Sequence, residues 1–186
     1  MTKNARHLSA AISLSVACHA AVAEPAKPII LKCSGVLWGE GIDAPKDEEI
    51  PGHEPNLESI YTMDGSTLTE SGGGISADTH YALCSSTNTN YLFSTDCSVQ
   101  RQQYVMNWLQ STTGEPENAS YFKKHPSSTW GLEIVSIDRV NLRVDEEFLV
   151  GHSRAHWDKA SNHMVFAPFL VSIRYSGNCA IAQPKL

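Results

Sequence analysis

Positive charge is scarce in this chain of 186 residues. There are 14 Lys and Arg against 20 Asp and Glu, a net charge of −6 at pH 7 with His neutral. Proteins that bind nucleic acid need a basic face, so this balance argues against that class of function. Beyond the N-terminal region the sequence also lacks an apolar run long enough for a membrane helix, so we expect a chain that is not transmembrane.

The short motifs of several enzyme classes are absent as well. The sequence contains no G-x-S-x-G elbow and no HExxH zinc motif. Its glycine run, residues 72–74, is not followed by the Lys of a phosphate-binding loop. These absences favour a protein that is not an enzyme, and we assign no catalytic residue, although scattered Ser, His and Asp leave a catalytic triad open.

The N-terminal segment has the features of a secretory signal peptide. Two basic residues precede a short apolar run, residues 8–17, which ends in the small-x-small sequence Ala21-Val22-Ala23. We predict that residues 1–23 are removed and that residues 24–186 form a single periplasmic or secreted domain, with a net charge of (14 − 2) − 20 = −8. A lipoprotein site at Cys18 is the alternative, but the residues before it lack the usual Leu.

Four cysteines remain after this cleavage: Cys33, Cys84, Cys97 and Cys179. In an exported chain they indicate two disulfide bonds, for which three connectivities exist. We favour Cys84–Cys97, which closes a short polar loop, with Cys33–Cys179, which would tie the first strand to the last. A zinc site made of the four is the weaker alternative, since no two lie at CxxC spacing.

Apolar and polar residues alternate along much of the chain, a period typical of strands with one buried face. In residues 130–150 we interpret this pattern as two strands joined by a turn at Asn141, because Asn tolerates the left-handed conformation. Pro168 lacks an amide donor, which predicts an edge position or a break in the last strand. Further strand candidates are residues 29–38, 59–63, 79–84, 91–97 and 165–175. In the first of them, Gly35 indicates a bulge or a close approach of the backbone.

Residues 99–110 are ambiguous. Tyr104, Trp108 and their neighbours fit one face of a helix, and a strand fits nearly as well. We interpret the acidic, proline-bearing residues 39–58 and residues 111–129 as irregular surface segments, and the glycine-rich residues 68–76 as a flexible turn. The prediction is therefore one all-β domain, an antiparallel barrel or sandwich with at most one short helix and two disulfides.

A histidine-rich stretch is the candidate metal site. His152, His156, Asp158 and His163 lie close together, and His-x3-His spacing places two imidazoles on one face of a helix or a strand. Such ligands suit zinc or copper, so a metal-binding protein or a metal-dependent hydrolase is the alternative function. Histidines in polar loops are more often simply solvated.

Asp138 and Arg139, set between two apolar strands, form the candidate binding pair. In one interpretation they present a ligand-binding turn. In the other, which we favour, Asp138 accepts backbone amides of the turn while Arg139 is solvated or clamps a neighbouring strand.

Both ends and the central hairpin resemble small exported proteins of Proteobacteria, most of them uncharacterised. The segments that carry the likeness are Leu31-Lys32-Cys33-Ser34-Gly35, Ile137-Asp138-Arg139-Val140, Tyr175-Ser176-Gly177-Asn178-Cys179 and Pro184-Lys185-Leu186. The chain departs from them at Asn141-Leu142, where those proteins have Thr-Gly. The resemblance implies a compact antiparallel β fold and pairing of the first cysteine with the last, and it implies no activity.

We therefore expect a non-catalytic periplasmic or secreted binding or interaction protein, of an inhibitor or immunity-like kind. Its partner would be another protein or an envelope ligand, with no cofactor unless the histidines hold a metal. A purely structural envelope protein is a third hypothesis. We expect the contact surfaces in residues 39–58 and 111–129, because loops on a disulfide-held scaffold commonly carry recognition.

Overall fold

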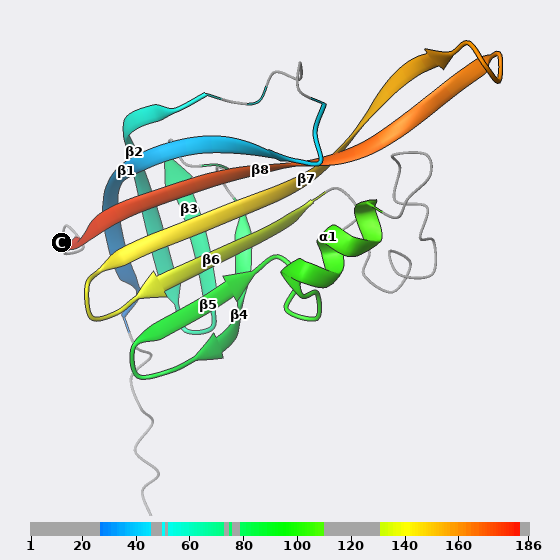
Figure 1. Cartoon of the computed structure of the whole chain (residues 1–186). Helices are drawn as coiled ribbons and strands as arrows, with labels where there is room; N and C mark the ends of the chain where they lie inside the picture. Colours follow the sequence, from blue (N-terminus) through cyan, green and yellow to red (C-terminus); the bar gives the residue numbers. More distant parts are fainter. Residues whose placement is uncertain are drawn as a thin grey trace, which may run out of the picture.

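The computed structural model describes residues 27–45, 50, 52–72, 75, 79–109 and 131–182. Each strand in this part of the chain pairs antiparallel with the next, and the first also pairs with the last, so the sheet closes into a barrel (Figure 1). The all-β prediction is confirmed, and of its two forms the barrel is the one observed. The elements are β1 (Ile29–Ile42), β2 (Glu54–Asp64), β3 (Thr67–Gly72), β4 (His80–Ser86), β5 (Asn90–Ser94), α1 (Arg101–Leu109), β6 (Leu132–Asp138), β7 (Arg143–Asp158) and β8 (His163–Ala182).

Closure depends on the pairing of β1 with β8, which runs from Ile30 opposite Ala182 to Ile42 opposite Leu170. Cys33 lies directly opposite Cys179 in this register, and the two form a disulfide across 146 residues of sequence. A second disulfide, Cys84–Cys97, closes a segment of 13 residues beside β4 and β5. Both predicted disulfides are confirmed.

The barrel interior is filled by the inward-facing side chains that strand alternation supplies. The expected face of the last strand points inward, with Val171 and Tyr175 buried. Tyr175 belongs to the main core cluster, which also contains Leu31, Tyr61, Leu68, Tyr81, Phe93, Val135 and Val144.

Helix α1 lies against the outer face of the barrel and resolves the ambiguity of residues 99–110. Its buried Tyr104 and Trp108 pack with Leu132, Leu149 and Leu170 in a second core cluster. The Trp108 Nε1 group donates to the Phe169 carbonyl at 3.0 Å. A nine-residue helix is unstable alone, so this packing is what stabilises it. No helix within the described residues is long and apolar enough to cross a membrane.

Two loop predictions were wrong. Within residues 39–58, β1 continues to Ile42 and β2 begins at Glu54. Within residues 68–76, β3 places Leu68 and Glu70 inside the barrel, so the glycines begin only where that strand ends. The histidine-rich stretch, for which a helix, a strand and a polar loop were open, lies in strands β7 and β8 and in the turn between them. Interstrand hydrogen bonds outweighed local polar composition in all three segments.

The turn between β6 and β7 differs from the prediction in one residue. Leu142, with φ of 51°, adopts the left-handed conformation that we expected at Asn141. Asn141 instead donates its side-chain amide to Asp138 Oδ2 at 2.7 Å. The two strands that the turn joins are as predicted. Trp130, at the start of the predicted first strand, lies outside the described residues, and so does the predicted irregular segment, residues 111–129.

The two disulfides should differ in their contribution to stability. In the chain-entropy model, replacing Cys33 and Cys179 with Ala costs about 5 kcal/mol, and replacing Cys84 and Cys97 costs about 3 kcal/mol, because the first loop is much longer. Urea denaturation of the two double variants would measure both values. A smaller loss for the Cys33/Cys179 pair would show that this disulfide does not restrain the unfolded chain as argued.

Helix α1 packs against the barrel at Gly151. A Cβ atom added there would lie 2.0 Å from Cζ2 of Trp108, so only glycine allows this contact. We expect Gly151→Ala to displace the helix and to destabilise the fold by about 1–3 kcal/mol, as overpacking does. The same change at Gly52, which has no atom within 4 Å of an added Cβ, is the matched control. Thermal unfolding followed by near-ultraviolet circular dichroism measures both, and equal melting temperatures would contradict the assignment.

Candidate functional site

Carboxylates lie inside the barrel among tyrosines. Glu146 on β7 is 2 % exposed and accepts two phenol hydrogen bonds, from Tyr61 at 2.6 Å and from Tyr81 at 2.9 Å. Glu70 on β3 is fully buried and accepts from the Ser59 hydroxyl at 2.7 Å. The cluster links β2, β3, β4 and β7 across the interior.

Burial dominates the electrostatics of this cluster. Desolvation, together with the nearby charge of Glu70, raises the pKa of Glu146 to about 8, although the two phenol bonds oppose the shift. Burial and the Glu146 charge also raise the pKa values of Tyr61 and Tyr81 far above the ordinary phenol value. At neutral pH, therefore, Glu146 carries a proton and both phenols stay neutral.

The proton on Glu146 links stability to pH. Because the pKa is higher in the folded state, the stabilisation is complete below the ordinary carboxyl pKa of about 4.5 and is lost as pH rises to about 8. We expect Glu146→Gln to remove most of this slope, which is on the order of 1 kcal/mol per pH unit. Urea denaturation between these two pH values measures the slope. Exposed Glu54 provides the control, and a Glu146→Gln slope equal to that of Glu54→Gln would refute the linkage.

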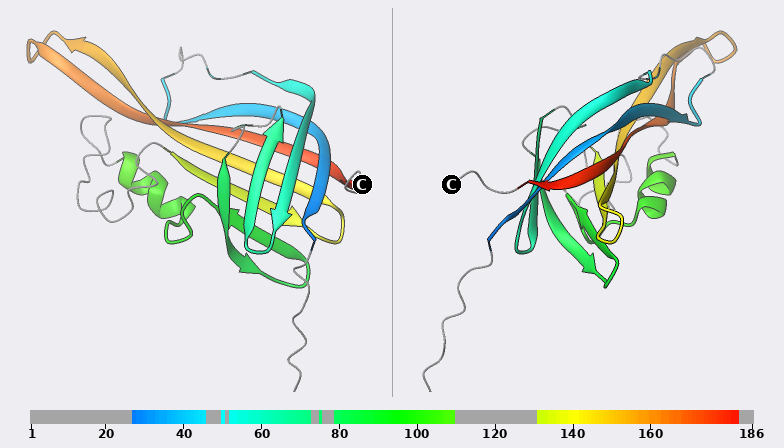
Figure 2. Two further views of the ribbon diagram at one scale, coloured as in Figure 1. Left: turned by 180° about the vertical axis from the view of Figure 1, so that it is seen from behind. Right: turned by 90° about the vertical axis from the view of Figure 1, so that its left-hand side faces the viewer.

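Beyond the barrel, β7 and β8 continue as a two-stranded hairpin that projects from the body (Figures 1 and 2). We call residues 152–169 the arm. Among the described strands, β6 stops pairing with β7 at Leu149, and β1 stops pairing with β8 at Leu170. Both edges of the arm are therefore unpaired in the described chain. Pro168 lies here, so the predicted edge position is confirmed.

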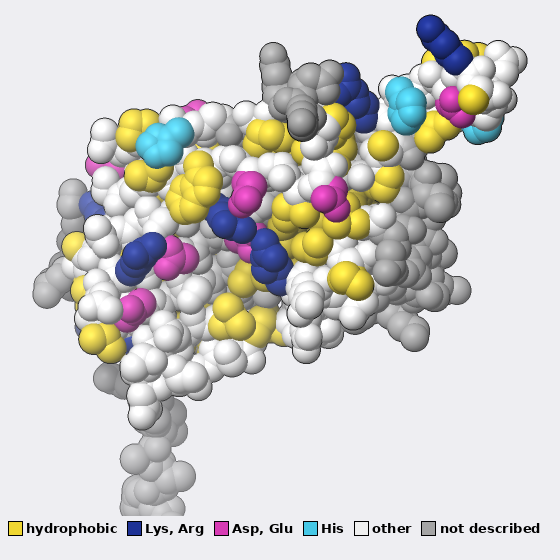
Figure 3. Space-filling view, viewed as in Figure 1, with side chains coloured by type: hydrophobic (Ala, Val, Ile, Leu, Met, Phe, Trp, Pro, Cys, Tyr) yellow, Lys and Arg dark blue, Asp and Glu magenta, His cyan; other side chains and the backbone are white. Residues whose placement is uncertain are grey.

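The arm is amphipathic. Alternation from Leu149 and Leu170, which pack under α1, assigns Ala155, Trp157, Met164 and Pro168 to one face. Trp157 lies directly opposite Met164, and the two are 55 % and 47 % exposed. The space-filling view shows hydrophobic, basic and histidine side chains together on this projection (Figure 3).

The opposite face of the arm carries the predicted metal ligands His152, His156, Asp158 and His163. His152 stacks on Phe169 with ring centroids 5.5 Å apart. Asp158 caps the arm's turn by accepting from the Ala160 amide at 3.0 Å and from the Ser161 hydroxyl. The shared face is as predicted, but within the described residues no three His, Cys, Asp or Glu gather into a metal-binding group.

The predicted binding pair, Asp138 and Arg139, has structural partners. Asp138 Oδ1 accepts from the Val140 and Asn141 amides at 2.8 and 3.0 Å, and the Asn141 bonds lower its pKa. Arg139 donates to the Thr87 carbonyl at 3.0 Å, and its guanidinium lies 4.5 Å from the Tyr91 ring centroid. These contacts agree with the interpretation we favoured, in which Asp138 holds the turn and Arg139 clamps a neighbouring strand.

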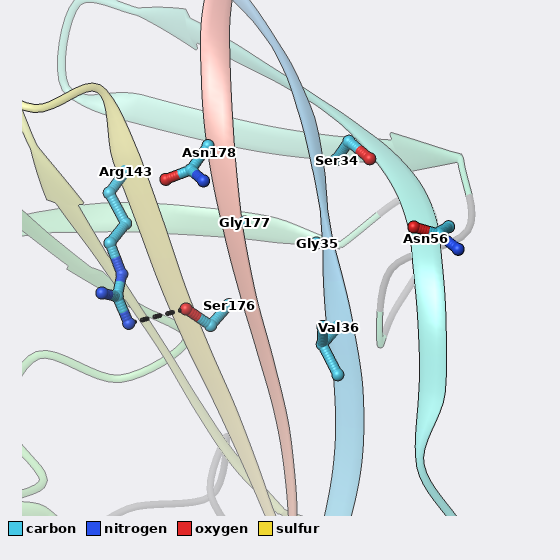
Figure 4. Close-up of a pocket in the computed structure, with 8 residues that line it drawn as sticks. All are labelled: Ser34, Gly35, Val36, Asn56, Arg143, Ser176, Gly177 and Asn178. Carbon is cyan, nitrogen blue, oxygen red and sulfur yellow. Dashed lines mark hydrogen bonds between the residues drawn. The ribbon is translucent and has the colours of Figure 1, made fainter.

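A hollow of about 350 Å³ lies on the outer face of the barrel, across β2, β1, β8 and β7 (Figure 4). A second, of about 460 Å³, shares Ser34 and Asn178 with it, and a third, of about 380 Å³, shares Arg143. We call the three together the outer groove. It follows β1 from Lys32 to Trp38, roughly 20 Å at the rise of an extended strand.

A β-bulge shapes the centre of this groove. Gly35 pairs with Leu57 and Val36 pairs with Pro55, which makes Asn56 the extra residue on β2. Asn56 has φ of 60°, a left-handed conformation that Asn tolerates better than most residues. Gly35 allows close contact with β8, because an added Cβ would lie 2.1 Å from the Ser176 carbonyl oxygen. The predicted bulge or close approach at Gly35 is thus confirmed in both forms.

No protein-family model matches this chain, and no curated protein and no solved structure matches it. The buried acids and the groove residues were not predicted from the sequence. A signal for the acids existed, because Glu146 shares the inward parity of Val144, and Glu70 shares that of Leu68.

Proposed function

We propose that this protein is a non-catalytic binding protein of the periplasm or extracellular space, and that its arm docks into a concave site on a protein partner. The observation that carries the proposal is the projecting hairpin with Trp157 and Met164 side by side and half exposed. Occupation of an enzyme's cleft, as by an inhibitor, is one form of such docking.

The two disulfides support the location, because such bonds persist in oxidising compartments. The signal-peptide features of residues 1–23 and the resemblance to small exported proteins agree with it. A partner is therefore sought among proteins of the cell envelope or the medium.

Trp157 and Met164 together offer exposed apolar surface that a partner can bury. Aromatic and Met side chains are enriched at the centres of protein interfaces, and Trp is prominent among residues that dominate binding energy. Removing the exposed parts of Trp157 and Met164 from water would contribute on the order of 2 kcal/mol. An isolated two-stranded hairpin is only marginally stable, so a partner that contacts both faces of the arm would also order it.

Charge narrows the kind of partner. The arm carries Arg154 and Lys159 against Asp158, a charge of 2 − 1 = +1, whereas the rest of residues 24–186 sums to −8 − 1 = −9. A basic projection on an acidic body favours approach to an acidic surface with the arm in front. A narrow projection also fits a recess better than a flat surface, as long insertion loops do in other binders. The expected partner site is thus an apolar recess with an acidic rim.

Site-specific photo-crosslinking tests the proposal. A benzophenone amino acid would replace Met164 in one variant and Val140 in another, and crosslinking would follow in the extracytoplasmic fraction of the source cells. Val140 is 69 % exposed in the β6–β7 turn, so it is a matched apolar control. We expect a protein adduct from position 164 and none of the same mass from position 140.

Affinity capture of that crosslinked protein then tests the energetics. We expect Trp157→Ala to weaken binding about tenfold or more, equivalent to about 1.4 kcal/mol, with Val140→Ser unchanged. Added salt should slow association, because the charges are exposed. Adducts from position 164 that contain only a second copy of this chain, or only lipid, would overturn the proposal, as would equal capture by the two variants.

A further inference from the structure

The outer groove is electrically balanced. Apart from the buried Glu146, the charged residues that line it are Lys32, Arg143 and Arg174 against Glu58, Asp145 and Glu147. Arg143 Nη2 lies 3.0 Å from Asp145 Oδ1, and Arg174 lies 3.2 Å from Glu147 and 3.4 Å from Glu40. Figure 3 shows basic and acidic side chains interleaved over this face. Two of the three cations are thus paired with carboxylates and have little attraction left for an anion, and the three positive charges are matched by three negative ones, so the groove favours an uncharged ligand.

The uncharged lining consists of groups that both donate and accept hydrogen bonds. Ser34, Asn56 and Asn178 are exposed around the central hollow (Figure 4). Hydroxyl and amide side chains offer donors and acceptors together, which matches a ligand whose own hydroxyls do both. Ser176 behaves in this way within the protein, since it accepts from Arg143 at 2.8 Å and donates to Asp145 at 2.7 Å.

The groove also has an aromatic side chain at one end. Trp38 lines the third hollow, together with Arg143 and Ser136. An indole ring supplies apolar contact and one N–H donor, a combination that suits a ligand with alternating C–H faces and hydroxyls. The length of the groove, roughly 20 Å, calls for an extended ligand rather than a single small molecule.

We infer that the outer groove binds a neutral oligosaccharide chain. The paired charges disfavour an anionic polymer, the bifunctional lining suits ring hydroxyls, and Trp38 suits the C–H face of a sugar. This site is separate from the arm and does not depend on the proposed protein docking.

Titration of the isotope-labelled protein, followed by nuclear magnetic resonance, tests the inference. The probes are maltohexaose, cellohexaose and chitohexaose as neutral chains, with polygalacturonate and an uncharged peptide as the comparison ligands. We expect at least one neutral chain to shift the Trp38 indole signal and the side-chain amide signals of Asn56 and Asn178. The affinity should not change with salt, because no net charge is neutralised.

Two variants localise the binding. Asn178→Ala and Trp38→Ala should each weaken it about tenfold, equivalent to about 1.4 kcal/mol. Asn88→Ala, an exposed Asn in the β4–β5 turn, is the matched control, and unchanged backbone spectra verify that each variant is folded. No shift with any of the three neutral chains, a stronger response to polygalacturonate or the peptide, or an equal loss in Asn88→Ala would each overturn the inference.

Discussion

Pairing of the first strand with the last is the constraint on which the other features depend. Pairing of each strand with the next would leave β1 and β8 as open edges, and their mutual pairing removes both. The Cys33–Cys179 disulfide crosses that seam near the end where β1 begins and joins positions 146 residues apart. Forming so distant a contact is costly in chain entropy, so a covalent link contributes most at this position. Closure also creates the interior that holds Glu146 and Glu70.

That interior is unusual in its chemistry. A barrel of this size is filled by side chains, and here the filling includes the carboxyl of Glu70 and the carboxyl of Glu146, which accepts hydrogen bonds from two phenols. The neutral, protonated form of Glu146 makes such burial tolerable, because an ionised carboxylate would be far more costly to desolvate. The hydrogen bonds from Tyr61 and Tyr81 connect three strands through one side chain. The core therefore depends on a proton as well as on apolar contacts.

The two proposed binding surfaces follow from where the closing strands stop and where they bend. β1 ends at Ile42, so β7 and β8 continue without it and project as the arm. The bulge at Asn56 disrupts the pairing of β2 with β1, and the opposed glycines Gly35 and Gly177 allow β1 and β8 to approach closely beneath the centre of the outer groove. The projecting arm is shaped to enter a recess on a protein, and the outer groove is shaped to hold an extended chain, so the two surfaces would bind different partners. Both lie on the outside of a scaffold that the barrel keeps rigid.

Local chemistry in the sequence determined the strands with clear alternation, the positions of both disulfides, the edge character of Pro168 and the bulge or close approach at Gly35. Each of these features depends on the conformational preference of a single residue, or, for the disulfides, on cysteines placed in the first and last strands and at the two ends of a short loop.

Predictions from the sequence were wrong, or stayed open, where hydrogen bonding between distant strands outweighed local composition. The histidine stretch became the arm because β7 and β8 hydrogen-bond to each other there, and residues 67–72 became a strand because β2 and β4 lie on either side. Glu70 and Glu146 followed the inward parity of their strands. Pairing of β2 with β3 brought Glu70 within reach of Ser59, but only the closed barrel brought Glu146 on β7 within reach of Tyr61 and Tyr81. Tertiary structure alone decides such neighbours, since strand alternation gives the side a residue faces and the register of the whole barrel gives the residue it meets.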